Sequence, residues 1–183
     1  MILCEETLAK NPRHAAAMVW HGSGLIGMSA TPFRQGDIAK GMDLWTRGLK
    51  EMDDAVAIAP DSLQTIIPRG ATLLAVAKYN PNLESRQQMI QTGVGDYEKV
   101  LRLQTNYFTN LSTHARGELL FGLADGWYRV GETNQCRAYL HRIETELHGC
   151  KYASEAHAWL TASNDLALRQ KSETRQCVGC HDR

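Results

Sequence analysis

Five residues near the end of the printed sequence, Cys177-Val-Gly-Cys180-His181, carry the most distinctive chemistry in the chain. Their C-x-x-C-H spacing is the pattern of covalent c-type haem attachment. Two thiols two residues apart can add to the two vinyl groups of a porphyrin, and the adjacent imidazole then ligates the iron. The sequence therefore predicts one covalent haem c, with Cys177 and Cys180 as thioether donors and His181 as the proximal iron ligand.

Besides haem attachment, two other interpretations of this motif remain open: metal or thiol chemistry, and an accidental match. Two cysteines and one histidine bind zinc only with a fourth ligand from elsewhere, and the chain has no second C-x-x-C. A thioredoxin-type redox pair should follow a strand, and no strand is predicted before Cys177. The third reading is an unmodified peptide that matches by accident. Since only five Cys and seven His occur in 183 residues, we favour haem attachment.

The sixth ligand of the iron is not identified by the sequence. A Met ligand would raise the reduction potential, a His ligand would lower it, and an empty position would allow a small ligand to bind. The upstream candidates are Met18, Met28, Met42, Met52, Met89, His14, His21, His114, His141, His148 and His157. Residues of these types on helices more often serve packing or the surface, so we assign none of them.

Composition and charge narrow the class of protein. The 183 residues are 43% hydrophobic, which suits a globular core, and 20 basic residues balance 20 acidic ones. We expect no nucleic-acid partner, because no basic patch is present. We also expect no membrane span, because no apolar run approaches about 20 residues. The common enzyme motifs are missing, so any chemistry should be that of the haem, and an electron carrier or interaction module is favoured over an enzyme.

The tail motif also predicts where the protein is found. The start, MILCEETLAKNPRH, has neither the basic region nor the apolar core of a signal peptide. Attachment of c-type haem normally takes place outside the cytoplasm. We therefore expect a periplasmic or other extracytoplasmic protein whose export signal lies upstream of Met1. The helix-like start at Met1 is also consistent with a subunit of a homo- or hetero-oligomeric complex.

Helical spacing of apolar residues dominates the chain. It predicts an all-α fold of seven or eight helices in antiparallel pairs, with residues 1–165 as a helical domain and 166–183 as the segment that carries the motif. The expected helices cover residues 13–29, 37–59, 66–79, 83–104 (one helix or two), 112–131, 132–147 and 152–170. Most large aromatic residues should pack in the core: Trp20, Trp45, Trp127, Trp159, Tyr97 and Tyr128.

Residues 117–149 resemble a tetratricopeptide repeat. Gly122 and Ala124 supply small residues inside the first helix, and Gly131 is at the turn. The second helix should turn Cys136, Leu140 and Ile143 inward. Looser matches cover residues 20–62 and 69–104. The resemblance implies a solenoid of helix pairs that binds a peptide or partner protein; an irregular helix bundle is the alternative.

The last ten residues, TRQCVGCHDR, look like the end of a class II cytochrome c, in which C-x-x-C-H lies on the last helix. The likeness does not extend upstream. Three hypotheses follow: a monohaem cytochrome that exchanges single electrons with a redox partner protein, an interaction scaffold in which the haem is accessory or absent, and a haem enzyme or sensor with an open iron site.

Overall fold

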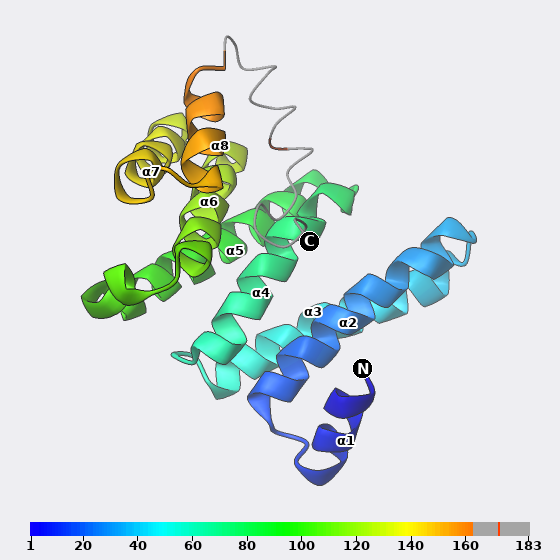
Figure 1. The fold of residues 1–183 in the computed structure, drawn as a ribbon. Helices are drawn as coiled ribbons and strands as arrows, with labels where there is room; N and C mark the ends of the chain where they lie inside the picture. The colour runs from blue at the N-terminus through cyan, green and yellow to red at the C-terminus, as the bar shows by residue number, and fades with distance from the viewer. Residues whose placement is uncertain (163–171, 173–183) are drawn as a thin grey trace. The chain divides into compact units, whose positions relative to one another are not determined.

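The computed structural model describes residues 1–162 and Ser172, and in this part of the chain every regular element is helical (Figure 1). The α-helices are α1 (Ile2–Lys10), α2 (Ala15–Arg34), α3 (Ile38–Ile58), α4 (Leu63–Val76), α5 (Leu83–Gln104), α6 (Thr113–Val130), α7 (Thr133–Glu146) and α8 (Lys151–Leu160). Two 3-10 helices, η1 (Ala77–Tyr79) and η2 (Thr105–Asn110), follow α4 and α5. The predicted all-α class is confirmed, whereas the predicted boundary between residues 165 and 166 lies outside the described residues.

The chain divides into two units, and the division falls inside α4. The N-terminal unit is Met1–Thr72, and the C-terminal unit begins at Leu73. Each unit is described by itself below.

The N-terminal unit is built on the antiparallel pair α2 and α3, which lie side by side in Figure 1. Gly36 permits the tight turn between them because its φ is +80°, and the Asp37 side chain caps α3 by accepting a hydrogen bond from the Lys40 amide at 3.1 Å. The two helices approach most closely at Gly22 and Gly48. A Cβ at either glycine would lie within 2.6 Å of the other's carbonyl oxygen.

The start of α2 differs from the prediction. Asn11 ends α1, and α2 begins at Ala15 after His14, whose Nδ1 accepts from the Ala17 amide at 3.2 Å. The helix also continues to Arg34, over the buried Pro32. Contact with α3 along the whole of α2 is a sufficient reason, because tertiary packing routinely overrides a local helix breaker.

The middle of the chain follows the predicted pattern with shifted ends. Helix α4 begins at Leu63, three residues before the prediction, and contains Pro68. Residues 83–104 form one helix, α5, whose N-cap Asn82 accepts from the Ser85 amide at 2.8 Å. Helix formation therefore continues through the Gly93 and Gly95 positions.

In the C-terminal unit, α5, α7 and α8 all contact α6. Ser112 caps α6, and Gly131, with φ of +99°, ends it, both as predicted. Gly122 leaves room for the ring of Tyr97 on α5, since a Cβ there would lie 2.2 Å from the ring. Phe121 packs edge-on against Trp159 of α8, with ring centroids 5.4 Å apart.

The inward face predicted for α7 is confirmed, because Cys136, Leu140 and Ile143 are all buried. The prediction of a core position is right for Trp159, which is 1% exposed, and wrong for Trp20, which is 58% exposed.

Candidate functional site

The residues predicted to hold haem, Cys177, Cys180 and His181, lie outside the described residues. The nearest described residue before them is Ser172, five positions before Cys177. The site therefore has to be built from Ser172 and the elements that it contacts.

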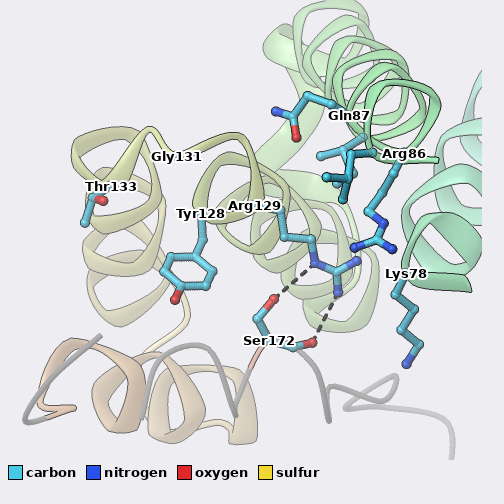
Figure 2. Close-up of a pocket in the computed structure, with 10 residues that line it drawn as sticks. Lys78, Arg86, Gln87, Tyr128, Arg129, Gly131, Thr133 and Ser172 are labelled. Atoms are coloured by element: carbon cyan, nitrogen blue, oxygen red, sulfur yellow. Dashed lines mark hydrogen bonds between the residues drawn. The ribbon is translucent and has the colours of Figure 1, made fainter. Parts of the chain in front are cut away.

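Ser172 is buried and makes three hydrogen bonds to α6, and Figure 2 shows the two that come from Arg129. Arg129 donates from Nε to the Ser172 hydroxyl at 3.1 Å and from Nη2 to the Ser172 carbonyl oxygen at 3.2 Å. The Ser172 hydroxyl in turn donates to Oδ1 of Asp125. Because a backbone atom of Ser172 takes part, the arrangement holds the main chain as well as the side chain.

Arg129 is itself held in place by its surroundings. Its Nη2 lies 2.7 Å from Oδ2 of Asp125, whose side chain is 2% exposed, and its Nη1 donates to the Leu74 carbonyl oxygen at 2.8 Å. Asp125 and Arg129 are one helical turn apart, which brings the two charges together. The Arg129 charge is thus paired with a carboxylate, and its guanidinium joins the end of α4, α6 and Ser172.

A cavity of about 620 Å³ lies beside the contact between Arg129 and Ser172, and both residues are part of its wall. This volume is in the range of small-molecule and cofactor sites, which is roughly 300–1,000 Å³. The described lining residues come from η1, the first turns of α5, the end of α6 and the turn into α7: Lys78, Leu83, Arg86, Gln87, Ile90, Tyr128, Arg129, Gly131, Thr133 and Ser172.

Three cationic side chains line the described cavity wall. Lys78, Arg86 and Arg129 line it, no described lining residue is acidic, and Figure 2 shows the three cations gathered on one side. Arg86 donates from Nε at 3.0 Å and from Nη2 at 2.8 Å to the Asn80 carbonyl oxygen. These bonds orient the guanidinium without neutralising its charge, so this wall suits an anionic group.

The rest of the wall is largely apolar. Ile90 is buried and Leu83 is exposed, at 73%. The ring of Tyr128, on the other side of the cavity from the cations in Figure 2, packs edge-on against Trp159 with centroids 6.3 Å apart. The cavity therefore combines apolar surface with cationic groups.

The candidate sixth ligands of the N-terminal unit have structural roles where they can be traced. His14 caps α2, and His21 Nδ1 lies 2.7 Å from the Glu51 carboxylate. Met52 is fully buried between α2 and α3, whereas Met28 and Met42 are exposed.

The candidates of the C-terminal unit are also engaged. His114 Nδ1 lies 2.8 Å from the Tyr152 hydroxyl, and His141 and His157 both contact Glu144, at 3.4 and 2.8 Å. His148 Nδ1 lies 3.4 Å from the Thr145 carbonyl oxygen, and the Met89 sulfur accepts from Asn80 Nδ2 at 3.5 Å. None of the candidates belongs to the described cavity wall, so the structure assigns no sixth ligand.

The described residues contain no group of three His, Cys, Asp or Glu side chains arranged to hold a metal ion. None of their helices has the length and apolar character that crossing a bilayer requires.

Comparison of the chain with protein-family models, with curated proteins and with solved structures found no match. The site therefore rests on its own residues. Sequence reasoning missed Arg86, Arg129 and Ser172, although the Asp125 and Arg129 spacing is a readable ion-pair signal. No local pattern in the sequence indicates that Ser172 meets this pair, because Ser172 lies 43 positions after Arg129.

Proposed function

We propose that this protein is a c-type haem protein that exchanges single electrons with a partner protein outside the cytoplasm. The observation that carries the proposal is the CVGCH motif, in which Cys177 and Cys180 would form the thioethers and His181 would ligate the iron. The haem would supply one-electron redox chemistry, and the helices would hold it and present it to the partner.

The described residues support this proposal through the position of Ser172. Arg129 fixes this residue on the C-terminal unit, and five residues of chain reach at most about 17 Å. Ser172 is thus the described residue nearest in sequence before Cys177, and it is held against α6. A motif that was only an accidental peptide would need neither this anchor nor a cavity beside it.

The test is a pyridine haemochrome spectrum of denatured protein that has been exported and produced together with cytochrome c maturation enzymes. We expect covalent haem in the wild type, loss of one thioether with Cys177→Ala or Cys180→Ala, and loss with both. Cys136→Ala is the matched control, because this thiol is buried in the helical core and should leave haem content unchanged. Wild-type protein without covalent haem would reject the proposal.

The absorption spectrum of the native holoprotein separates the carrier from a haem enzyme or sensor. A six-coordinate, low-spin iron supports electron transfer, because both axial positions are then filled. A high-spin iron that binds carbon monoxide or nitric oxide would favour the open-site alternative instead.

A second candidate is an interaction scaffold, in which helix pairs do the work and haem is accessory. Large apolar side chains that the N-terminal unit leaves exposed favour it: Trp20 (58%), Ile38 (58%), Met28 (51%) and Met42 (47%). Exposed apolar groups of this size are typical of association surfaces. The test compares the mass in solution of Cys177→Ala/Cys180→Ala protein with that of the same protein carrying Trp20→Ala and Met28→Ala. Association that needs Trp20 and Met28 but no haem supports the scaffold.

A further inference from the structure

We propose that Arg116 and Arg142 form a binding site for a phosphate group, and that Glu146 occupies this site when no phosphate is bound. All three residues belong to the C-terminal unit, Arg116 to α6 and the other two to α7. The proposal goes beyond the proposed function, because it needs neither haem nor the C-x-x-C-H motif. It adds an anion site that no sequence motif indicates.

The two guanidiniums share one floor, the ring of Phe108 on η2. The Cζ atom of Arg116 lies 5.3 Å from the ring centroid, and that of Arg142 lies 4.9 Å from it. A cation within about 6 Å of an aromatic ring is attracted to its face, and Phe108 is itself buried. The ring therefore holds both cations at one place, so an anion meets two oriented groups and little free energy is lost in ordering them.

The same two arginines meet at one carboxylate. Arg116 Nη2 donates to Glu146 Oε2 at 3.1 Å and to the Glu146 carbonyl oxygen at 3.5 Å, and Arg142 Nε donates to Glu146 Oε1. Each oxygen of the carboxylate thus bonds a different arginine. The contacts of Glu146 demonstrate that an oxyanion fits between the two guanidiniums.

Hydrogen-bond donors and positive charge exceed what Glu146 supplies. Among the described residues, Glu146 is the only carboxylate that contacts either guanidinium, so one positive charge is left unbalanced. Nε of Arg116 is buried and has no acceptor among these residues. A buried N–H group without an acceptor is unfavourable. An anion with further acceptor oxygens would therefore stabilise this pair of arginines.

The site is open on the side of Arg142. The Arg142 side chain is 34% exposed and that of Glu146 is 30% exposed, whereas that of Arg116 is 14% exposed. The Glu146 carboxylate can therefore turn into water, and the oxygens of an incoming anion can take its place. Burial raises the pKa of Glu146, but the hydrogen bonds from Arg142 and Arg116 outweigh it and keep this pKa below its ordinary value. Glu146 is thus ionised at neutral pH and competes with the anion.

Charge favours phosphate over a second carboxylate. Arginine guanidiniums bind both groups in the same forked geometry. A phosphate monoester or inorganic phosphate carries about 1.5 to 2 negative charges at pH 7, which matches two guanidiniums once Glu146 has moved away. A carboxylate carries one negative charge and only repeats the balance that Glu146 already provides.

The experiment is a calorimetric titration of the full chain with inorganic phosphate at constant ionic strength, combined with the NMR signal of the Arg116 Nε–H group. We expect a single saturable binding event and a shift of this signal as phosphate is added. Sodium acetate at the same ionic strength is the comparison, and we expect it to bind more weakly.

Two variants change the affinity in opposite directions. Arg142→Gln removes a cation from the open side of the site and should weaken phosphate binding about 10-fold or more, because a charge-assisted hydrogen bond is lost. Glu146→Gln removes the competing charge at nearly the same side-chain volume. It should tighten phosphate binding about two- to fivefold, which corresponds to the strength of a partly exposed ion pair.

Arg137→Gln is the matched control. Arg137 is exposed on the same helix, five residues before Arg142 and therefore on a different face. Its loss removes the same formal charge without touching Phe108 or Glu146, so phosphate affinity should stay at the wild-type value. Circular dichroism of each variant checks that the helices are intact.

The outcomes decide the proposal independently of haem attachment, which the haemochrome spectrum tests. Tighter binding in Glu146→Gln together with weaker binding in Arg142→Gln supports the site. Absence of saturable phosphate binding in both the wild type and Glu146→Gln would overturn it, as would equal weakening by Arg142→Gln and Arg137→Gln. Acetate binding as tight as phosphate binding would overturn the assignment of phosphate as the ligand.

Discussion

Arg129 holds Ser172 by both its hydroxyl and its carbonyl oxygen, although 43 residues separate the two in the sequence. The same guanidinium meets the buried Asp125 one helical turn earlier. This arrangement ties the stability of the C-terminal unit to the position of Ser172.

We expect Arg129→Ala to lower the free energy of unfolding by about 3–5 kcal/mol, because it leaves the Asp125 carboxylate buried without its cation. The measurement is urea unfolding of Cys177→Ala/Cys180→Ala protein. Arg47→Ala is the matched control. Arg47 pairs with Asp43 at the same spacing but in the open, so its loss should cost less than about 1 kcal/mol. Equal losses of unfolding free energy in Arg129→Ala and Arg47→Ala would show that the buried pair stabilises the fold no more than the exposed one.

The contact between Gly22 and Gly48 leads to a second prediction. Gly22→Ala should destabilise the protein by about 1–3 kcal/mol, because its methyl group would meet the Gly48 carbonyl oxygen, a backbone atom that cannot turn aside. Gly27→Ala on the same helix has open space around its Cβ and should stabilise the protein by about 0.5–1 kcal/mol. Thermal unfolding of the two variants tests the difference in sign.

Thiol reactivity tests the packing of α7. Burial, aided by the charge of Asp125, raises the pKa of the Cys136 thiol to about 12. Since the thiolate is the reactive form, native protein should leave Cys136 unmodified by iodoacetamide at pH 8, whereas the half-buried Cys4 and Cys150 react. Peptide mapping by mass spectrometry gives the result. Rapid labelling of Cys136 below the unfolding transition would contradict the buried position.

Alkaline unfolding tests the contact between Tyr139 and Glu98. Burial and the hydrogen bond to Glu98, at 2.7 Å, raise the pKa of Tyr139 above its ordinary value of 10.0. The raised pKa stabilises the folded state fully below pH 10, and this contribution is lost as pH rises above 10, because the unfolded chain then releases the proton more easily.

Tyr139→Phe should therefore flatten the fall of stability above pH 10, at a cost of about 1 kcal/mol at neutral pH from the lost hydrogen bond. Tyr107→Phe, at an exposed position, is the control and should keep the wild-type slope. Parallel pH profiles for wild type and Tyr139→Phe would refute the assignment.

Local signals in the sequence predicted much of the fold. Asp37, Ser112 and Gly131 act at helix ends through their own side chains or backbone freedom, so their positions could be read directly. Pro32 and Trp20 were misread because contact with other helices decides whether a helix continues and which face is covered. The CVGCH motif could be recognised because its residues are contiguous in the sequence. The cavity could not be, because it joins residues from 78 to 172 that share no sequence pattern.

The hydrogen bonds around Arg129 have a consequence for how substitutions in the C-terminal unit combine. Arg129 contacts Asp125, Ser172 and the Leu74 carbonyl oxygen at once, so these groups form one connected network. Substitutions within one network do not add, because the first already removes part of what the second would remove. The loss of stability in an Asp125→Ala/Arg129→Ala double variant should therefore be smaller than the sum of the two single losses, which urea unfolding measures.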